Sequence, residues 1–73
     1  MNSIRLDIEG LEATETQHRV KNQLSALNGV YNVKCSEGQT YVDLNYDEEI
    51  SQPEIRNHLQ NNGYKIREIG KLW

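Results

Sequence analysis

The chain has a single cysteine, Cys35, and a single proline among its 73 residues. One cysteine cannot form a disulfide within the chain, so nothing in the sequence indicates an oxidising compartment. No apolar run approaches the ~20 residues of a membrane span, and the first ten residues lack the apolar segment of a signal peptide. These absences predict a single soluble domain over residues 1–73, located in the cytoplasm and not inserted in a membrane.

Basic residues are also scarce. Eight Lys and Arg stand against eleven Asp and Glu, which gives a net charge of −3, and the cationic residues are scattered singly. Proteins that bind nucleic acids need clustered cations to displace counterions from phosphates. RNA-binding sheets also carry two or three aromatic residues beside basic ones, whereas the outward face of residues 41–45 offers only Tyr41, next to Asp43 and Asn45. The sequence therefore predicts no nucleic-acid partner.

The residue combinations typical of enzymes are missing as well. There is no nucleophile paired with a base, no glycine-rich phosphate loop and no pair of carboxylates placed to face a cleft. We therefore expect no catalytic residues and no enzymatic activity.

What the sequence does contain is a strand–helix–strand pattern, and the first copy occupies its first half. "SIRLDIEG" alternates apolar and polar residues, which predicts a half-buried strand over 3–10. Thr14, with Gln17 three positions later, matches a capping box and predicts the N-cap of a helix. Asn28-Gly29 is a typical helix end. A second alternating strand is expected around 32–35.

The second copy begins across a hairpin. The turn "SEGQ" separates the strand around 32–35 from another alternating strand over 41–45. Ser51 with Glu54 forms a second capping box, and Pro53 between them is tolerated in a first helical turn. This helix is expected to end at Asn62-Gly63, and "YKIREI" supplies the last strand.

The resulting element order predicts a ferredoxin-like βαββαβ fold of the α+β class. Each strand–helix–strand crossover is right-handed, which places both helices on one face of a four-stranded antiparallel sheet. The residues expected to point into the core are Ile4, Leu6, Ile8, Val20, Leu24, Leu27, Val33, Cys35, Val42, Leu44, Ile55, Leu59 and Ile66.

Several passages resemble the heavy-metal-associated domain, the fold of copper chaperones and of the N-terminal modules of copper-pumping ATPases. The resemblance covers roughly residues 4–69. It implies a role in metal trafficking or homeostasis and a protein partner such as a metal-pumping ATPase module, a chaperone or a regulator. The passages that carry it are "IRLDIEG", "HRVKNQLSALNGV", "YNVKC", "YVDLNYDEEIS" and "EIRNHLQNNGYKI".

The metal-binding loop of that family reads Gly-Met-x-Cys-x-x-Cys, and this chain departs from it at three positions. Gly10 matches, Leu11 replaces the methionine, and the two cysteines fall on Ala13 and Thr16. Cuprous ion is soft and is held by thiolates, which neither a methyl group nor a protonated hydroxyl can replace. We therefore expect a degenerate metal-binding site, no resident cofactor, and docking to a partner in place of carrying copper or another soft metal.

The resemblance also implies where a partner binds. In the family, partners meet at the end of the molecule that holds this loop. Glu12 and Glu15 would form an acidic rim there, Leu11 an exposed apolar anchor, and Tyr64 would lie beside the loop. Glu15 also suits the positive end of the helix that follows.

A competing hypothesis is a metal site that uses Cys35 and a histidine as ligands. Alternation with Val33 directs Cys35 into the core, where free cysteines are common. His18 is expected on the solvated side of its helix, and His58 is expected to be partly buried and hydrogen-bonded. Trp73 is expected to anchor the tail on the sheet or on a partner, or to fray.

Overall fold

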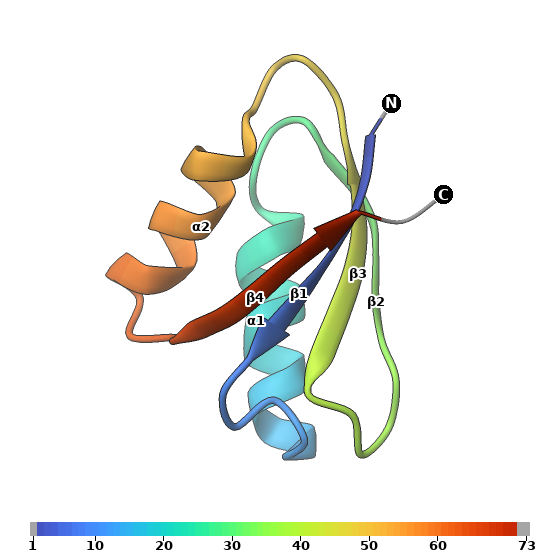
Figure 1. Cartoon of the computed structure of the whole chain (residues 1–73), viewed down its shortest axis with the longest axis vertical. Helices are drawn as coiled ribbons and strands as arrows, with labels where there is room; N and C mark the ends of the chain where they lie inside the picture. The colour runs from blue at the N-terminus through green and yellow to red at the C-terminus, as the bar shows by residue number, and fades with distance from the viewer. Residues whose placement is uncertain (1, 72–73) are drawn as a thin grey trace.

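The computed structural model describes residues 2–71 (Figure 1). The last strand begins two residues later than expected, because the Tyr64 N–H donates to the carbonyl of Leu59 and still belongs to the end of the preceding helix. The expected role of Trp73 falls outside the described residues. The six elements follow the predicted order: β1 (Asn2–Ile8), α1 (Thr14–Ser25), β2 (Val30–Cys35), β3 (Tyr41–Tyr46), α2 (Gln52–Asn61) and β4 (Ile66–Lys71).

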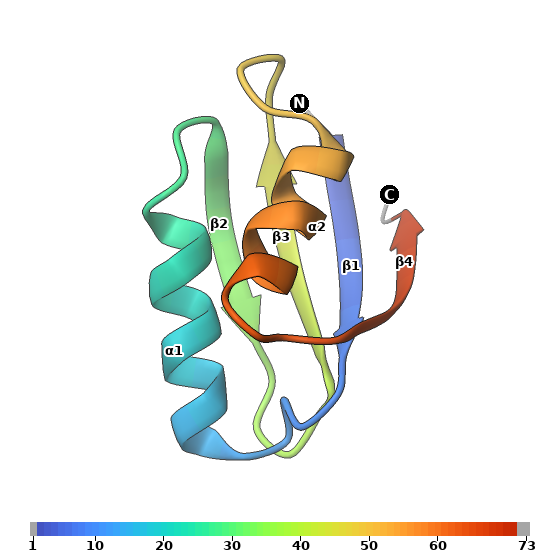
Figure 2. The ribbon, with the colours of Figure 1, turned by 90° about the vertical axis from the view of Figure 1, so that its left-hand side faces the viewer.

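The sheet has the strand order β2-β3-β1-β4, and all neighbouring strands are antiparallel. Both helices cover the same face of it, which leaves the other face open (Figures 1 and 2). This arrangement confirms the predicted ferredoxin-like fold. The β1–α1 loop lies at one end of the molecule and the β3–α2 connection at the other (Figure 2). Within residues 2–71, no helix is long and apolar enough to cross a membrane.

The core lies between the sheet and the helices. Ten of the thirteen predicted core residues are buried, whereas Leu27, Cys35 and Ile66 are only partly buried against the cluster. The structure adds four residues that alternation did not identify. The buried cluster consists of Ile4, Leu6, Ile8, Leu11, Val20, Leu24, Val30, Val33, Val42, Leu44, Tyr46, Ile50, Ile55 and Leu59.

Strand β2 contains an irregularity that explains one of these additions. Val30 and Val33 are both buried although they are three residues apart, which a regular strand does not allow. The pairing with β3 shifts register between Tyr31 and Lys34, and Asn32 between them has a φ of 55°. The extra residue lets both valines face the core.

The two helices begin differently. In α2, the Ser51 hydroxyl accepts from the Glu54 N–H and the Glu54 carboxylate accepts from the Ser51 N–H, which confirms the predicted capping box. In α1, Thr14 is already helical and Ala13 is the N-cap, with no side-chain hydrogen bond. The predicted Thr14 cap is therefore wrong, since the chain enters this helix one residue earlier.

Candidate functional site

The β1–α1 loop is held against the core by Leu11. Its side chain is 0 % exposed, and its N–H donates to the carbonyl of Ile8. The prediction that Leu11 is an exposed apolar anchor is therefore wrong. A leucine at this point instead extends the core beneath the loop, because burying its side chain is worth about 1.5–3 kcal/mol.

The two positions that hold thiolates in the heavy-metal-associated pattern lie at the start of α1. Ala13 is the N-cap and is exposed, while Thr16 is half-buried in the first turn. No side chain caps this helix, and the acidic residue near the positive end of its dipole is Glu15 in the first turn. The electrostatic setting that favours thiolates is present, but the thiol groups are absent.

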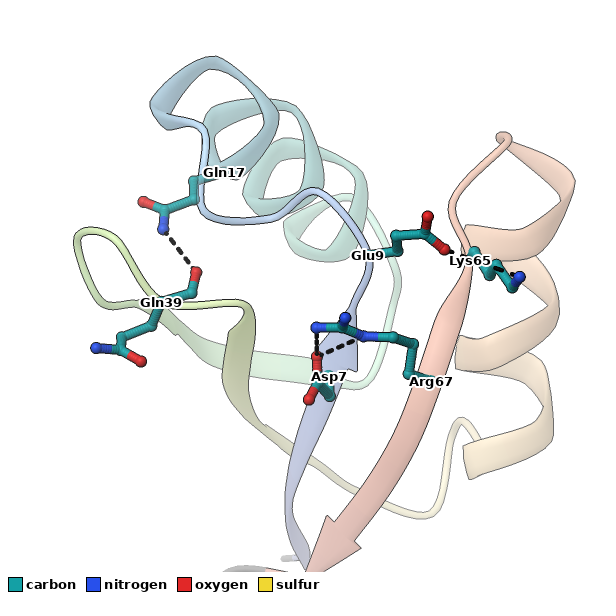
Figure 3. A network of polar contacts seen from close by, with 6 residues as sticks. All are labelled: Asp7, Glu9, Gln17, Gln39, Lys65 and Arg67. Carbon is teal, nitrogen blue, oxygen red and sulfur yellow. Dashed lines mark hydrogen bonds and ion pairs between the residues drawn. The ribbon is translucent and has the colours of Figure 1, made fainter.

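Polar contacts tie the loop end to segments on both sides of it (Figure 3). On one side, the Gln17 amide donates to the carbonyls of Ser36 (2.8 Å) and Gln39 (3.2 Å) in the β2–β3 turn. The predicted role of Gln17 in a capping box is thus replaced by this tether. On the other side, the N–H of Glu9 donates to the carbonyl of Lys65 (2.9 Å), and their side chains form an ion pair at 3.8 Å.

A further ion pair joins β1 to β4 directly below the loop. The Arg67 guanidinium donates to Asp7 Oδ1 at 2.7 Å (Figure 3). This hydrogen bond lowers the pKa of the Asp7 carboxyl and raises the pKa of the Arg67 guanidinium. Together with the Gln17 and Lys65 contacts, the pair fixes the frame from which the loop projects.

The acidic residues of the loop are exposed, as an acidic rim requires. Glu15 pairs with Arg19 one turn along α1, at 2.8 Å. Within residues 2–71, Glu12 makes no ion pair at 4.0 Å or less, although its charge contributes to the raised pKa of the Arg67 guanidinium. In the same range, no three Asp, Glu, His or Cys side chains come together as a group that could hold a metal ion.

Tyr64 follows the end of α2. Its side chain is half-buried and packs against the core cluster. The residue that follows it, Lys65, accepts the backbone hydrogen bond from Glu9 described above, so this segment runs next to the end of β1. The position of the Tyr64 side chain beside the loop stays a prediction.

The fold separates His58 from the other two alternative ligands. Cys35 is half-buried at the end of β2, whereas the sequence predicts it in the core. Burial raises the pKa of its thiol, and the nearby Lys21 ammonium partly offsets this shift. His18 is exposed as predicted, and it lines the same small hollow as Cys35. His58 is half-buried in α2, but its buried Nε2 has no hydrogen-bond partner, contrary to expectation.

The open face of the sheet does not offer a stacking platform. The Arg5 guanidinium lies 3.9 Å from the centre of the Tyr41 ring and covers it. The same guanidinium makes two hydrogen bonds to the Asp43 carboxylate, at 2.8 and 3.1 Å. These contacts join side chains on the neighbouring strands β1 and β3. They can be predicted from the alternation of side chains along each strand once the register between the two strands is known.

No protein-family model matches this chain, and no curated protein matches it. Solved structures do match over nearly the whole length. A copper-binding domain of HMA7, a P-type ATPase, is 19 % identical with a TM-score of 0.87, and all of both chains is covered. The yeast copper transporter domain Ccc2a is also 19 % identical, with a TM-score of 0.84 and coverage of 99 % of this chain and 100 % of that one.

A third similar structure is the N-terminal domain of a potential copper-translocating P-type ATPase from Bacillus subtilis. It is 24 % identical with a TM-score of 0.82, and 99 % of this chain and 92 % of that one are covered. The chain shares the ferredoxin-like fold of these copper-binding and copper-transporting domains.

Proposed function

We propose that this chain is a docking protein of metal trafficking, which presents the heavy-metal-associated fold to a partner without holding cuprous ion in its loop. The observation that carries the proposal is a tethered, well-packed loop whose two thiolate positions are Ala13 and Thr16. Among the similar structures are domains of copper-transporting ATPases, which supports a pump module, a chaperone or a regulator as the partner. No chemical step is assigned to the chain.

The proposed contact surface, here named the loop surface, consists of residues 12–16 together with Tyr64. Glu12 and Glu15 give it a negative charge suited to a partner with a basic face. Leu11 is excluded from it because its side chain is buried. A surface of this size fits a transient encounter that buries about 1,200 Å² or less.

The tethers at the loop end favour docking. Gln17 holds the start of α1 to the β2–β3 turn, and the contacts between Glu9 and Lys65 hold the loop to the segment before β4. A loop that is already ordered loses less conformational freedom when a partner binds. The loop surface is therefore suited to recognition without refolding. We propose that this encounter takes place in the cytoplasm.

The location of the contact is tested by NMR shift mapping. Isotope-labelled chain is titrated with the metal-binding domain of a copper-transporting ATPase from the same organism. We expect the perturbed amides to cluster at residues 12–16 and Tyr64. A cluster on the open sheet face around Tyr41, or no perturbation by ATPase, chaperone or regulator domains, contradicts the proposal.

The role of charge is tested with a matched pair of reversals. Glu12→Lys lies on the loop surface, whereas Glu48→Lys lies in the exposed β3–α2 connection at the opposite end of the molecule. We expect Glu12→Lys to lower the association rate at low salt and the difference to shrink as salt is raised, because salt screens exposed charges. Equal effects of the two reversals would show that only the net charge matters.

A further inference from the structure

The chain contains two Asn-Gly pairs, Asn28-Gly29 and Asn62-Gly63, and each lies just after a helix. Asparagine followed by glycine is prone to deamidation, because glycine has no side chain to hinder attack by its backbone nitrogen on the asparagine side chain. Both glycines have a positive φ, 92° at Gly29 and 91° at Gly63. Only glycine adopts this conformation without a steric penalty, so the fold itself places glycine after each asparagine.

Hydrogen bonds hold both reacting groups of the second pair. The Gly63 N–H donates to the carbonyl of Gln60 at 3.0 Å. The side chain of Asn62 donates through Nδ2 to the carbonyl of His58 at 2.7 Å. Ring closure requires a glycine nitrogen that is free to attack and a side chain that is free to turn toward it. Both hydrogen bonds must therefore break before Asn62 can react.

The first pair has neither restraint. Within residues 2–71, no hydrogen bond involves the Gly29 N–H or the Asn28 side chain. Asn28 is exposed, so water and hydroxide reach it. The glycine is also required by packing, since a Cβ on Gly29 would lie 2.8 Å from Asp47 Oδ1. The same backbone that needs Gly29 thus leaves Asn28 open to attack.

We propose that Asn28 is a site of spontaneous deamidation in this protein, and that the fold protects Asn62 from the same reaction. In the first step the Gly29 nitrogen bonds to Asn28 Cγ and the bond from Cγ to Nδ2 breaks. The proton from the Gly29 nitrogen leaves with the side-chain nitrogen as ammonia, and a succinimide ring remains. Water then opens the ring at one of its two carbonyls, which gives aspartate or isoaspartate at position 28. No oxidation or reduction occurs, and water is the only co-reactant.

The product disturbs a contact between two connections of the fold. The Gly29 carbonyl accepts from the Asp47 N–H at 2.9 Å, and Asp47 Oδ1 accepts from the Glu49 N–H at 2.9 Å. Isoaspartate carries the backbone through an additional carbon, which shifts Gly29 relative to Asp47. Either product also adds a negative charge beside the β3–α2 connection, which already contains Asp47, Glu48 and Glu49. Deamidation at Asn28 therefore lowers the stability of the domain.

This modification goes beyond the proposed docking function and does not depend on it. The β3–α2 connection, on which Gly29 packs, lies at the end of the molecule opposite the β1–α1 loop (Figure 2). Shift mapping with a partner tests docking, whereas ageing of the chain alone tests deamidation. Failure of one leaves the other standing.

The site is tested by ageing the full chain in mildly alkaline buffer, once folded and once unfolded in urea. Cleavage after Lys and Arg places the two pairs in separate peptides, 22–34 and 57–65, and mass spectrometry follows conversion of each amide to a carboxyl group. In the folded chain we expect Asn28 to react more than about tenfold faster than Asn62, the factor that two hydrogen bonds supply. In urea the two rates should converge. Equal rates in the folded chain, or a difference that persists in urea, would overturn the proposal.

The consequence for stability is tested with a matched pair of variants, Asn28→Gln and Asn62→Gln. Each removes one Asn-Gly pair, because the longer glutamine side chain closes its ring far more slowly. After ageing, the unchanged chain and Asn62→Gln should unfold at a lower urea concentration than before, whereas Asn28→Gln should keep its midpoint. An equal fall in all three proteins, or an unchanged midpoint in a chain whose Asn28 has reacted, would contradict this consequence.

Discussion

Leu11 shows how a single residue can change the interpretation of a site. It lies in a loop, where neither the two-residue period of strands nor the 3.6-residue period of helices applies, so its burial is not predictable from periodicity. The fold brings it over Ile8 and into the core. The loop therefore covers the core, and its polar residues face outward. Leu11, the residue expected to contact a partner, packs inside the domain instead.

Truncation of Leu11 should therefore destabilise the whole domain. We expect Leu11→Ala to lower the free energy of unfolding by about 2–5 kcal/mol, the range for removing a buried leucine side chain. Leu11→Met conserves the volume and should cost less than about 1.5 kcal/mol. Urea unfolding followed by circular dichroism measures both. A loss below about 0.5 kcal/mol for Leu11→Ala would instead indicate the exposed anchor.

The helices show which element boundaries a sequence specifies. Ser51 and Glu54 flank a proline that cannot lie deeper in a helix, so only one start for α2 is consistent with all three residues. Ahead of α1, Thr14 and Gln17 have the spacing of a capping box, yet the loop pinned by Leu11 delivers the chain one residue earlier. The local pattern is ambiguous there, and long-range packing decides the boundary.

This difference predicts opposite effects of two similar substitutions. Ser51→Ala removes a side-chain cap and should destabilise the domain by about 1 kcal/mol. Thr14→Ala removes no cap and places a better helix former in the first turn, so it should be neutral or stabilising by up to about 0.7 kcal/mol. The measurement compares the urea concentrations at the unfolding midpoints of the two variants, provided that the dependence of the unfolding free energy on urea concentration is unchanged. Equal losses of stability in the two variants would show that the Thr14 side chain does cap α1.

At the scale of the whole molecule, fold and site depend on different residues. Alternation, two capping patterns and the turns were enough to predict the sheet and the helix layer, because many residues contribute to each and single departures are tolerated. The contacts around the loop depend on pairs distant in sequence, such as Gln17 with Ser36 and Asp7 with Arg67. Such pairs follow from exact register and loop path, which the sequence pattern does not define.

Because the fold is shared with copper-binding domains, placing two cysteines at these positions should create a metal-binding loop. We expect Ala13→Cys combined with Thr16→Cys, made in a Cys35→Ser background to remove the thiol of the hollow, to bind one cuprous ion per chain. The exposed, uncapped start of α1 favours two thiolates there. Competition with a chromogenic chelator measures the binding, and each single cysteine variant in the same background is the control. A folded double variant that binds no more tightly than the single variants would show that burial of Leu11 and the tethers at the loop end hold these two positions too far apart to share an ion.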